Sequence, residues 1–437
     1  MTLKAAALLP ALALLAHAGA KELPVADAGE FATVAGGGVR PGDVIVLAAG
    51  EWKDAALKLD ADGTEAAPVR IKALTPGTTL LTGNSRLSIS GDHIIVEGLW
   101  FKNPTGDEAL EFRTRSDQLA SDCRVTQCAV TNDLPADDTG HSARFASIYG
   151  ARNRIDHCLF QGKTTLGTTM VVWLAGETTD QGRHHIDHNY FGPRPPLGKN
   201  GGETIRIGDS KTSMQRADCV VEDNVFERCD GEGECISNKS CGNLYQHNTF
   251  LAVSGTLTLR HGNDCTVQKN TFLGQGAKGT GGVRVIGERH RVLGNYFEGL
   301  RGEDERAALC FMLGIPSSPA HGYFQVKDAR IEGNVFVNCD HPVVIGVAGS
   351  KTAMLPPVGV QMTGNFITGA ARAIDARCDI TGLRWKANLT NAKTTGIPKT
   401  DGLVIGGPKA AAAPETTISR HQVGPEWWKN EQQKEGP

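Results

Sequence analysis

Two carboxylates, an amine and an arginine–histidine pair occur close together in the middle of the chain. Glu232, Glu234 and Lys239 lie in the stretch GEGECISNKSCGN, and Arg260 and His261 follow in LTLRHGN. Carboxylates two residues apart would project to the same side of a strand, and they would repel each other unless a cation joined them. Calcium takes several oxygen ligands from carboxylates, amides and water. The residues alone leave two interpretations open, a salt-bridged surface and a metal site beside a proton-transfer site.

The bulk composition limits the classes of protein to consider. The 437 residues suffice for one large domain or for two to three average ones, and the hydrophobic content of 40 % allows a sizeable core. The net charge of −3 argues against a generic nucleic-acid binder, which would be globally basic. It still allows an anionic substrate that is bound in a local basic groove.

The N-terminus is typical of a secretory signal peptide. Residues 1–20 read MTLKAAALLPALALLAHAGA, with an early lysine, an apolar run and small residues at the end. No later segment has about 18 unbroken apolar residues, so we expect no membrane span in the mature protein. These features predict a periplasmic or extracellular protein.

All eleven cysteines lie in the mature part of the chain, so at least one has no partner within it. They show no Cys-x-x-Cys pair with zinc spacing. We interpret them as small buried hydrophobic residues, and one or two disulfides remain an open alternative.

A four-residue motif with Asn in second and Phe in fourth place recurs along the chain. Its copies are HNYF, DNVF, HNTF, KNTF, GNYF and GNVF, with the asparagines Asn189, Asn224, Asn248, Asn270, Asn295 and Asn334. Three consecutive spacings are 24, 22 and 25 residues, whereas the spacings of 35 and 39 indicate one repeat with an inserted loop. HCLF, which ends at Phe160, and TGNFI, which contains Asn365, are weaker copies.

Short runs rich in β-branched residues precede the asparagines, as in CVVED and CTVQK, and their alternation predicts short strands. A strand–turn repeat of this length predicts an all-β solenoid, a parallel β-helix whose equivalent residues stack about 4.8 Å apart. We expect the asparagines to form an inward ladder and the phenylalanines to stack in the core. Leucine-rich repeats have a Leu-x-x-Leu-x-Leu pattern that is missing, and a propeller would need longer units.

The ends of the solenoid can also be placed. Asp27–Gly37 is the best helix candidate and precedes the first strands, so we expect an N-terminal capping helix over the open end. The alanine-rich stretch Pro408–Thr417 breaks the strand pattern. We therefore predict a signal peptide over 1–20, a single β-helix domain over 21–407 and a C-terminal tail over 408–437.

The repeat relates the candidate site residues to one another. Strand alternation would put Lys239, five residues after Glu234, on the opposite face, so a corner or bulge must intervene, and SNKSCGN has residues that suit a turn. Arg260 follows Lys239 by 21 residues, close to one coil, so stacking would place them roughly 5 Å apart. Asn200, one inserted coil before Glu232, could add an amide oxygen to a metal site.

Four stretches of this region resemble polysaccharide lyase family 6, which includes alginate lyases and chondroitinase B. They read NGGETIRIGDS, DGEGECISNKSCGN, LTLRHGN and TGGVRVIG. The resemblance covers nearly the whole mature chain, including PGDVIVLAAGEW, SISGDHIIVEGLWFKN and GPEWW. It implies a right-handed parallel β-helix, in agreement with the repeat, and β-elimination on a polyuronate.

The resemblance also implies roles for individual residues. The positions that match Asn200, Glu232 and Glu234 hold Ca²⁺ in the family. Lys239 matches the base that takes the C5 proton of the uronate. Arg260 matches the residue beside the leaving O4, where it would act as an acid or as an electrostatic stabiliser.

Three further residues are candidates for substrate binding. Arg206 and His261 match positions that contact substrate in the family, and Arg284 in GGVRVIG is another candidate for the groove. Weaker candidates are Arg194, Lys199, His290 and Tyr323.

We therefore expect a secreted, Ca²⁺-dependent lyase that cleaves alginate by β-elimination and leaves unsaturated uronate ends. A dermatan sulfate lyase similar to chondroitinase B is the main alternative within the family. A non-catalytic glycan-binding β-helix and a glycoside hydrolase that uses Glu232 and Glu234 as opposed carboxyls are alternatives from other classes. The predicted partner is the anionic polysaccharide and no nucleic acid, and the sequence leaves the oligomeric state open.

Overall fold

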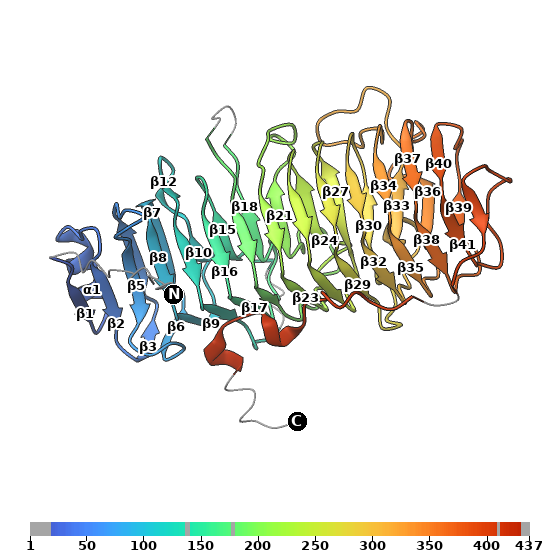
Figure 1. The fold of residues 1–437 in the computed structure, drawn as a ribbon. Helices are drawn as coiled ribbons and strands as arrows, with labels where there is room; N and C mark the ends of the chain where they lie inside the picture. The colour runs from blue at the N-terminus through green and yellow to red at the C-terminus, as the bar shows by residue number, and fades with distance from the viewer. Residues whose placement is uncertain (1–18, 136–139, 176–179, 409–410, 430–437) are drawn as a thin grey trace, which may run out of the picture.

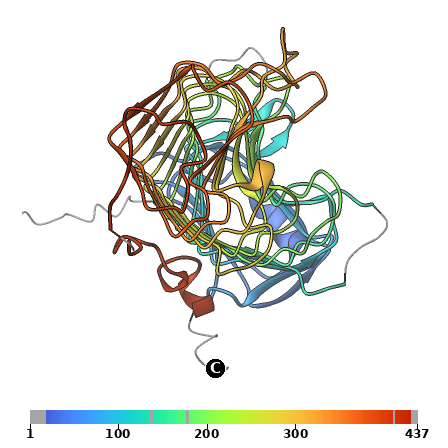
Figure 2. The same ribbon diagram turned by 90° about the vertical axis from the view of Figure 1, so that its right-hand side faces the viewer.

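The computed structural model describes residues 19–135, 140–175, 180–408 and 411–429. Within these ranges the chain winds into a long parallel β-helix, and three sheets of 14 strands run along it (Figure 1). The view along the axis shows the coils stacked behind one another (Figure 2). The prediction of an all-β, single-domain parallel β-helix is confirmed. Residues 1–18 of the predicted signal peptide lie outside the described residues.

Each sheet receives one strand from almost every coil. Sheet A contains, in spatial order, β1 (Glu22–Val25), β2 (Val44–Leu47), β5 (Val69–Ala73), β8 (Ile94–Glu97), β13 (Arg124–Thr126), β16 (Arg154–Asp156), β19 (His185–Asp187), β22 (Val220–Glu222), β25 (Leu244–Gln246), β28 (Thr266–Gln268), β31 (Arg291–Leu293), β34 (Arg330–Glu332), β37 (Val360–Thr363) and β40 (Leu383–Lys386). Sheet B contains β3 (Gly50–Lys53), β6 (Thr79–Gly83), β9 (Trp100–Pro104), β14 (Ala129–Thr131), β17 (Leu159–Gln161), β20 (Tyr190–Phe191), β23 (Val225–Glu227), β26 (Thr249–Leu251), β29 (Thr271–Leu273), β32 (Tyr296–Glu298), β35 (Val335–Val337), β38 (Phe366–Thr368), β41 (Asn388–Thr390) and β42 (Leu403–Ile405).

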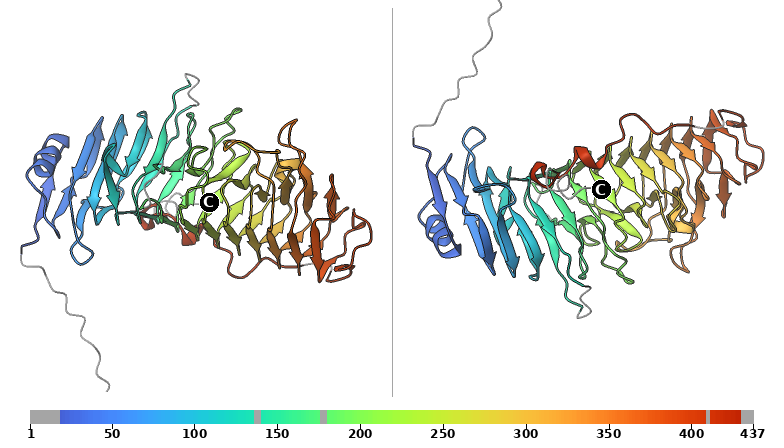
Figure 3. Two further views of the ribbon diagram at one scale, coloured as in Figure 1. Left: turned by 90° about the horizontal axis from the view of Figure 1, so that it is seen from above. Right: turned by 90° about the horizontal axis from the view of Figure 1, so that it is seen from below.

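Sheet C carries the candidate site. It contains β11 (Arg113–Arg115), β12 (Gln118–Ser121), β7 (Arg86–Asp92), β10 (Glu108–Glu111), β15 (Arg144–Ile148), β18 (Met170–Val172), β21 (Ile205–Gly208), β24 (Glu234–Lys239), β27 (Thr256–His261), β30 (Val283–Val285), β33 (Leu309–Met312), β36 (Val343–Val347) and β39 (Ile374–Ala376), with β4 (Ala56–Asp60) paired to β7. The β11–β12 hairpin is antiparallel. Two views from above and below show the strands of successive coils side by side (Figure 3).

The recurring asparagines form a continuous ladder inside the solenoid, as predicted. In each step the side-chain Nδ2 of one asparagine donates to Oδ1 of the next at 2.9–3.1 Å, and its backbone N–H donates to the same oxygen. The ladder consists of Asn189, Asn224, Asn248, Asn270, Asn295, Asn334, Asn365 and Asn388. Asn189 bonds directly to Asn224, and Asn295 to Asn334. The spacings of 35 and 39 residues are therefore single coils with inserted loops, as predicted.

The phenylalanines of the motif stack in the core next to this ladder. Successive rings lie nearly parallel with centroids 4.5–5.4 Å apart, and the stack consists of Phe160, Phe191, Phe226, Phe250, Phe272, Phe297 and Phe336. Offset stacking of this kind adds to the burial of large apolar area. All eleven cysteines are free thiols, and all but Cys378 are buried, which confirms their interpretation as small core residues.

The N-terminal end is covered as expected. Helix α1 (Ala28–Gly36) begins after Asp27, whose side chain accepts the backbone N–H groups of Gly29 and Glu30. Its buried Phe31 belongs to the core cluster, and the helix packs against β4 and β1. The helix therefore shields the apolar end of the first coils from water, and the prediction of a capping helix is confirmed.

The segment after the last strand does not extend away from the solenoid. It runs back along sheet B toward the first coils, where it is drawn in red beneath β9 and β17 (Figure 1). Trp427 Nε1 donates to the backbone oxygen of Gln127 at 2.7 Å, and the backbone N–H of Gly424 donates to the backbone oxygen of His188 at 2.8 Å. Trp427 and Trp428 pack against Trp100. The C-terminal segment therefore joins coils that are far apart in the sequence. Among the described residues, every helix is too short or too polar to cross a bilayer.

Two buried histidines occupy corners where other coils place asparagine or cysteine, directly before a strand of sheet A. Nδ1 of His184 accepts the backbone N–H of Asn153, and Nδ1 of His290 accepts that of Cys265. Burial lowers the pKa of His184 to about 3 and that of His290 to about 4. Both rings are therefore neutral in the folded protein at ordinary pH.

Because of these two histidines, we expect the free energy of unfolding to fall in mild acid. Below about pH 6.5 the unfolded chain binds a proton at each histidine that the folded chain does not bind, so stability falls with pH. Between pH 7.5 and 5 each contributes a loss of about 2 kcal/mol. His184→Asn should remove the part of this loss that is due to His184. The curve of unfolding free energy against pH, measured by urea titrations, should therefore be flatter for the variant. Exposed His421→Asn is the control, and an unchanged slope for His184→Asn would contradict the prediction.

Candidate active site

The candidate residues lie on the outer face of sheet C. Arg206, Ser237, Thr258 and Arg284 are aligned partners in the neighbouring strands β21, β24, β27 and β30. Their sequence neighbours on these strands point into the core. The parallel pairing thus turns residues that are far apart in the sequence into one row along the outer surface.

An extra residue in β24 brings Glu234 and Lys239 to the same face. Glu234 and Ile236 pair with consecutive residues of β27, so Cys235 is the extra residue of a β-bulge. Because the alternation restarts after the bulge, Glu234 and Lys239 both face outward although they are five positions apart. The expected irregularity is confirmed, but it lies inside the strand before Lys239 and not in a turn at SNKSCGN.

A second irregularity corrects the predicted stacking of Arg260 on Lys239. Asn238 pairs with Leu259, but Lys239 pairs with His261, so Arg260 is an extra residue in β27. The predicted register was wrong by one residue. The bulge turns both Arg260 and His261 toward the site side of the coil, where alternation would have turned one of them into the core.

Glu232 lies in the turn before β24 and not on the strand that was expected for it. Its Oε2 accepts the backbone N–H groups of Gly201 and Gly202 at 2.6 and 3.0 Å. Burial, followed by the nearby carboxylates of Glu203 and Glu234, raises the pKa of Glu232 to about 7. The turn therefore holds an excess of negative charge that a cation would relieve.

Glu234 is surrounded by positive charge. Its Oε1 forms an ion pair with the guanidinium of Arg284 and lies 3.8 Å from Nε of Arg260. Its Oε2 accepts a hydrogen bond from Ser237. Arg284 is only 9 % exposed in its side chain, and its Nε is buried without a hydrogen-bond partner. This arrangement leaves a buried donor unsatisfied beside Glu234.

A cavity of about 710 Å³ opens beside these residues. It is lined by five of the eight predicted site residues, namely Asn200, Glu232, Glu234, Arg260 and Arg284. Lys239, Arg206 and His261 lie next to it on the outer face of the same strands. The structure thus brings all eight residues to one region, although they come from four coils.

Lys239 stands beside an unusual buried carboxylate. Its Nζ lies 3.8 Å from Oε1 of Glu203, whose side chain is 3 % exposed and whose Oε2 has no hydrogen-bond partner. In the same preceding coil Lys239 is aligned with Gly208, which has a φ of +77° and where a Cβ atom would lie 2.6 Å from the backbone oxygen of Lys239. The glycine therefore allows the close approach of β21 and β24 next to the amine.

Arg206 and His261 complete the face on either side of Lys239. The guanidinium of Arg206 lies 4.9 Å from the ring centroid of Trp173, and burial lowers the pKa of this arginine. Burial, followed by Arg260 and Lys239, lowers the pKa of His261 to about 3. His261 is therefore neutral and can serve only as a hydrogen-bonding group. Nε of Arg206 and Nδ1 of His261 have no partner in the folded chain.

The weaker candidates separate into two groups. Lys199 and Tyr323 line the cavity. Arg194 is almost fully buried, where it donates to backbone oxygens of Glu203 and Gly167, and His290 is fully buried at its corner. Arg194 and His290 therefore hold the local backbone and do not face the groove.

Sequence reasoning missed three features of this region. Glu203 lies in the recognised stretch NGGETIRIG, but nothing in the sequence marks its carboxylate as buried beside Lys239. Arg306 reaches the cavity from the short η1 turn (Asp304–Arg306), far along the chain. Trp173 lies directly after β18 in a coil that lacks the full Asn–Phe motif. To predict that Trp173 lies near Arg206, one would have needed the register between the two coils.

The donor set around Glu232 fits a calcium ion. Two carboxylates and an amide oxygen on one cavity are hard oxygen ligands, which Ca²⁺ prefers. Burial and the neighbouring carboxylates raise the pKa of Glu232, and Oε2 of Glu203 has no partner, so a cation would stabilise the ionised carboxylates there. Asn200, Glu232 and Glu234 would hold the ion.

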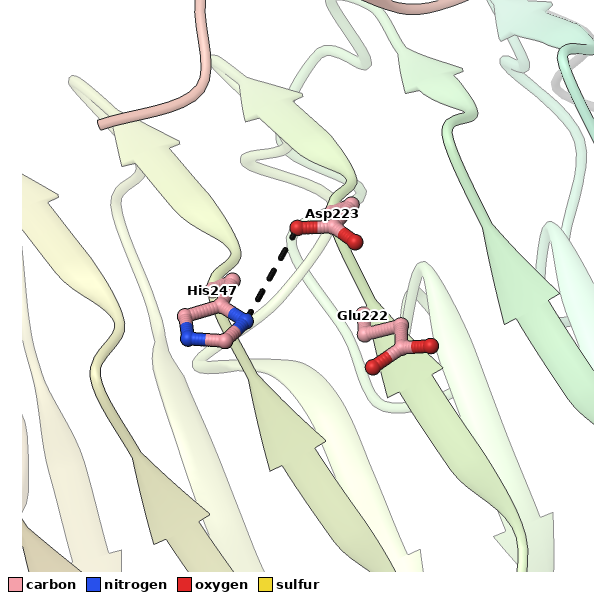
Figure 4. A group of neighbouring side chains, drawn as sticks. All are labelled: Glu222, Asp223 and His247. Atoms are coloured by element: carbon pink, nitrogen blue, oxygen red, sulfur yellow. Dashed lines mark ion pairs between the residues drawn. The ribbon is translucent and has the colours of Figure 1, made fainter. Parts of the chain in front are cut away.

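A second acidic group lies on sheet A and the turn that follows it. Glu222, Asp223 and His247 have ligand-type atoms within 4.8 Å of one another, which no other such group among the described residues does (Figure 4). Glu222 already accepts hydrogen bonds from His185 and Gln246, and Asp223 pairs with His247 at 3.9 Å. This group is therefore internally compensated, and it serves as a comparison for the predicted site.

Comparisons with known proteins agree on one family. The sequence profile described as Chondroitinase B matches residues 29–419. The structure is similar to the PL6 family alginate lyase AlyGC, with a TM-score of 0.87 and 37 % identity over 93 % of this chain. The match spans only 58 % of the AlyGC chain.

A second solved structure has nearly the same length as this chain. It is a mannuronic acid specific polysaccharide family 6 lyase from human gut microbiota, with a TM-score of 0.83 and 28 % identity. The match covers 94 % of this chain and 98 % of that one. A PL6 alginate lyase in complex with a trisaccharide, at 21 % identity, shows the same fold. A comparison with curated protein sequences found no match.

The donor set predicts that calcium stabilises the folded protein through Glu232. At a concentration about 100 times its Kd, an ion that binds only the folded state adds about 2.7 kcal/mol. Thermal melts with Ca²⁺ and with a chelator should differ for the natural protein, and Glu232→Gln should abolish most of the difference. Without calcium, Glu232→Gln should cost little because it removes a crowded negative charge.

Glu222→Gln is the matched control, since Glu222 belongs to the second acidic group. It should leave the calcium-dependent shift unchanged. If Glu222→Gln removes the shift and Glu232→Gln keeps it, the ion binds at the second group and the prediction is wrong.

Proposed function

Because the chain belongs to the chondroitinase B family of polysaccharide lyases, polysaccharide lyase family 6, we propose that it is a Ca²⁺-dependent lyase that cleaves alginate by β-elimination. The observation that carries the proposal is the grouping of Arg260 and the Glu232–Glu234 pair around one cavity on sheet C, with Lys239 on the outer face next to it. This grouping depends on two β-bulges in neighbouring strands, and bulges are over-represented next to active sites.

In the proposed reaction, Lys239 Nζ takes the C5 proton of a uronate residue. The electron pair of the C5–H bond forms the C4–C5 double bond while the bond from C4 to the bridging O4 breaks. Arg260 lies one strand further along and stabilises negative charge on O4. The guanidinium keeps its protons, so water supplies the proton that O4 needs. The products are a saccharide with a free hydroxyl and one with an unsaturated uronate end.

The other side chains on the outer face of sheet C would bind the uronate carboxylates. Arg206 and Arg284 each carry a buried Nε without a partner, and a carboxylate oxygen would satisfy it with a charge-assisted hydrogen bond. His261 offers a neutral ring to the same region. A calcium ion held by Asn200, Glu232 and Glu234 would withdraw charge from the uronate carboxylate and so acidify its C5 proton.

Alginate is preferred over dermatan sulfate because several arginines of this face already have carboxylate partners. Arg284 and Arg260 face Glu234, Arg144 pairs with Glu108, and Arg113 pairs with Glu111. A sulfated chain would call for additional unpaired cations. AlyGC, which is 37 % identical, is an alginate lyase by its description. We further propose that the protein acts in the periplasm or outside the cell, from the signal-peptide character of residues 1–20.

A glycoside hydrolase is the second candidate, and the raised pKa of Glu232 favours it. Such enzymes use one protonated and one ionised carboxyl group on opposite sides of the bond. Glu234, held by two arginines, would be the ionised group. Hydrolysis produces new reducing ends without a double bond, so the absorbance of the products separates the two functions. The pair shares one edge of the cavity, which favours joint metal binding over opposed roles.

The proposal predicts that Lys239→Ala abolishes elimination and preserves binding. General base catalysis contributes about 10²–10⁴-fold, so the rate of ultraviolet absorbance increase on alginate should fall by that factor. Binding of alginate oligomers, measured by calorimetry, should change little. Exposed Lys386→Ala on sheet A is the control and should keep full activity.

Dermatan sulfate is assayed in parallel. Elimination on dermatan sulfate alone would keep the mechanism and replace the substrate. If Lys239→Ala retains more than about a tenth of the activity, Lys239 is not the base. Folded protein that produces no double bonds on either polymer would favour the binding-module alternative.

A further inference from the structure

We propose that the groove of sheet C is closed at one end, so that the enzyme shortens its polysaccharide from a chain end and holds the rest of the polymer on a shelf of aromatic and arginine side chains. The shelf consists of Tyr149, Trp173, Arg113 and Arg144. The inference rests on the proposed function, because it concerns the polymer that this site would cut.

The closed end is formed by residues 313–327, which we call the wall loop and which appear in orange in Figure 1. Beyond Arg284 the outer row of sheet C continues with Cys310 in β33 and Val344 in β36. Both are fully buried although they lie on the outer face, because Tyr323 and Phe324 of the wall loop pack over their cluster. The row that is polar at the site becomes apolar and covered two strands later.

The wall loop is fixed to the site itself. Arg260 donates from Nη1 to the backbone oxygen of Gly322 at 2.9 Å, and its guanidinium lies 4.3 Å from the ring centroid of Tyr323. The Tyr323 ring rests on Gly349, where a Cβ atom would lie 2.3 Å from the ring. Cβ atoms do not approach that closely, so the glycine allows the contact. The residue proposed to act at O4 is thus also bound to the wall.

The opposite edge of the groove completes the closure. Glu305 and Arg306 of η1 line the same cavity as Tyr323. Ala307, directly after η1, belongs to the same apolar cluster as Cys310 and Tyr323, so both edges contribute to the cover over β33, about one coil or 5 Å beyond Arg284. A bound chain can extend only a short distance past Arg260 in this direction.

Toward the N-terminal coils the same face carries the shelf. Tyr149, Trp173, Gly208 and Lys239 occupy equivalent places at the ends of β15, β18, β21 and β24. The rings of Tyr149 and Trp173 stack with centroids 6.1 Å apart and an angle of 13°. Gly208 is buried and contributes no side chain to this row between Trp173 and Lys239. A sugar chain that passes over this position would connect the shelf to the base.

Arginines extend the shelf away from the site. Arg113 lies 3.9 Å from the ring centroid of Tyr149, and Arg144 lies 5.3 Å from that of Trp173. Both also line a cleft of about 970 Å³. Because β15 is three strands from β24, this cleft begins about 14 Å from Lys239, which leaves room for further sugar residues.

The pairing of these arginines suits a polymer that must move. Arg113 is paired with Glu111 at 2.7 Å and Arg144 with Glu108 at 3.1 Å, so their charge is partly neutralised. Aromatic rings provide contact area that does not depend on the substituents of the sugar. A chain held in this way can advance toward the wall after each cut, whereas a row of unpaired arginines would hold it in place.

The first test compares viscosity with double-bond formation on polymeric alginate. Removal of short pieces from an end lowers the viscosity slowly for each double bond, and unsaturated products of one to three sugars should dominate from the earliest samples. A rapid fall in viscosity with a ladder of medium-sized products would overturn the inference while the lyase assignment stands. An absence of double bonds would overturn the proposed function instead.

The second test concerns the shelf. Tyr149→Ala and Arg113→Ala should each raise KM for polymeric alginate about tenfold, whereas kcat/KM for a trisaccharide should change less than twofold. Arg330→Ala, an exposed arginine on sheet A, is the matched control and should change neither value. Equal losses on polymer and trisaccharide would show that the shelf does not hold the distant sugars, and this would overturn the inference.

The third test concerns the wall. Tyr323→Ala removes the ring that covers the end of the groove, so medium-sized products should increase severalfold among the early products. Melting temperatures show whether the variant is folded. If folded Tyr323→Ala gives the product pattern of the natural protein, the ring is not part of the barrier. The shelf variants provide an independent test if Tyr323→Ala does not fold.

Discussion

The register between successive coils is the constraint on which the site depends. Each asparagine of the ladder uses its side-chain oxygen to bind the asparagine of the coil before it, through both the amide and the backbone N–H. A coil that slipped by one residue would leave buried donors without partners, at a cost of about 1–3 kcal/mol for each group. The phenylalanine stack fixes the same register by shape. With the core fixed in this way, irregularities can be placed on sheet C without a change in alignment elsewhere.

The repeat made the core predictable from sequence, and it left much of the site unpredictable. The Asn–Phe motif identified the coils, the inward ladder and the two insertions, because each of these depends on residue type at a regular spacing. The positions of Lys239 and Arg260 depend on bulges at Cys235 and at Arg260 itself, which break that spacing. Alternation indicated that an irregularity had to precede Lys239, but nothing in the residue types marks Cys235 or Arg260 as the extra residue, so the predicted stacking of Arg260 on Lys239 was wrong by one residue. The grouping of the site residues came from the family resemblance and not from the period.

Loops bring further residues to the cavity. Tyr323, a weaker candidate in the sequence, comes from the wall loop, and Arg306, which no local pattern indicated, comes from η1, and both line the cavity with Glu232. Glu203 is close to Lys239 only because β21 and β24 are adjacent strands. Contacts of this kind depend on the length and path of insertions, which are set by packing against the outer face of the sheet. The sequence held one signal for such a loop. Val344 is an apolar residue in an outward position, so another segment has to cover it.

A solenoid distributes its stability over neighbouring coils. This explains how the fold tolerates the unfavourable free energy of the polar groups at the site. The crowded carboxylates of Glu203 and Glu232 and the unpartnered atoms of Arg206 and Arg284 all oppose folding locally. In a nearly one-dimensional structure such a cost is carried by the adjacent coils, which here include five uninterrupted steps of the asparagine ladder from Asn189 to Asn334. The C-terminal segment adds a long-range link, since Trp427 returns to Gln127 near the first coils. Local opening at the site would therefore have to break the asparagine ladder beneath the site. The groups that would bind substrate are thus held in place before substrate binds.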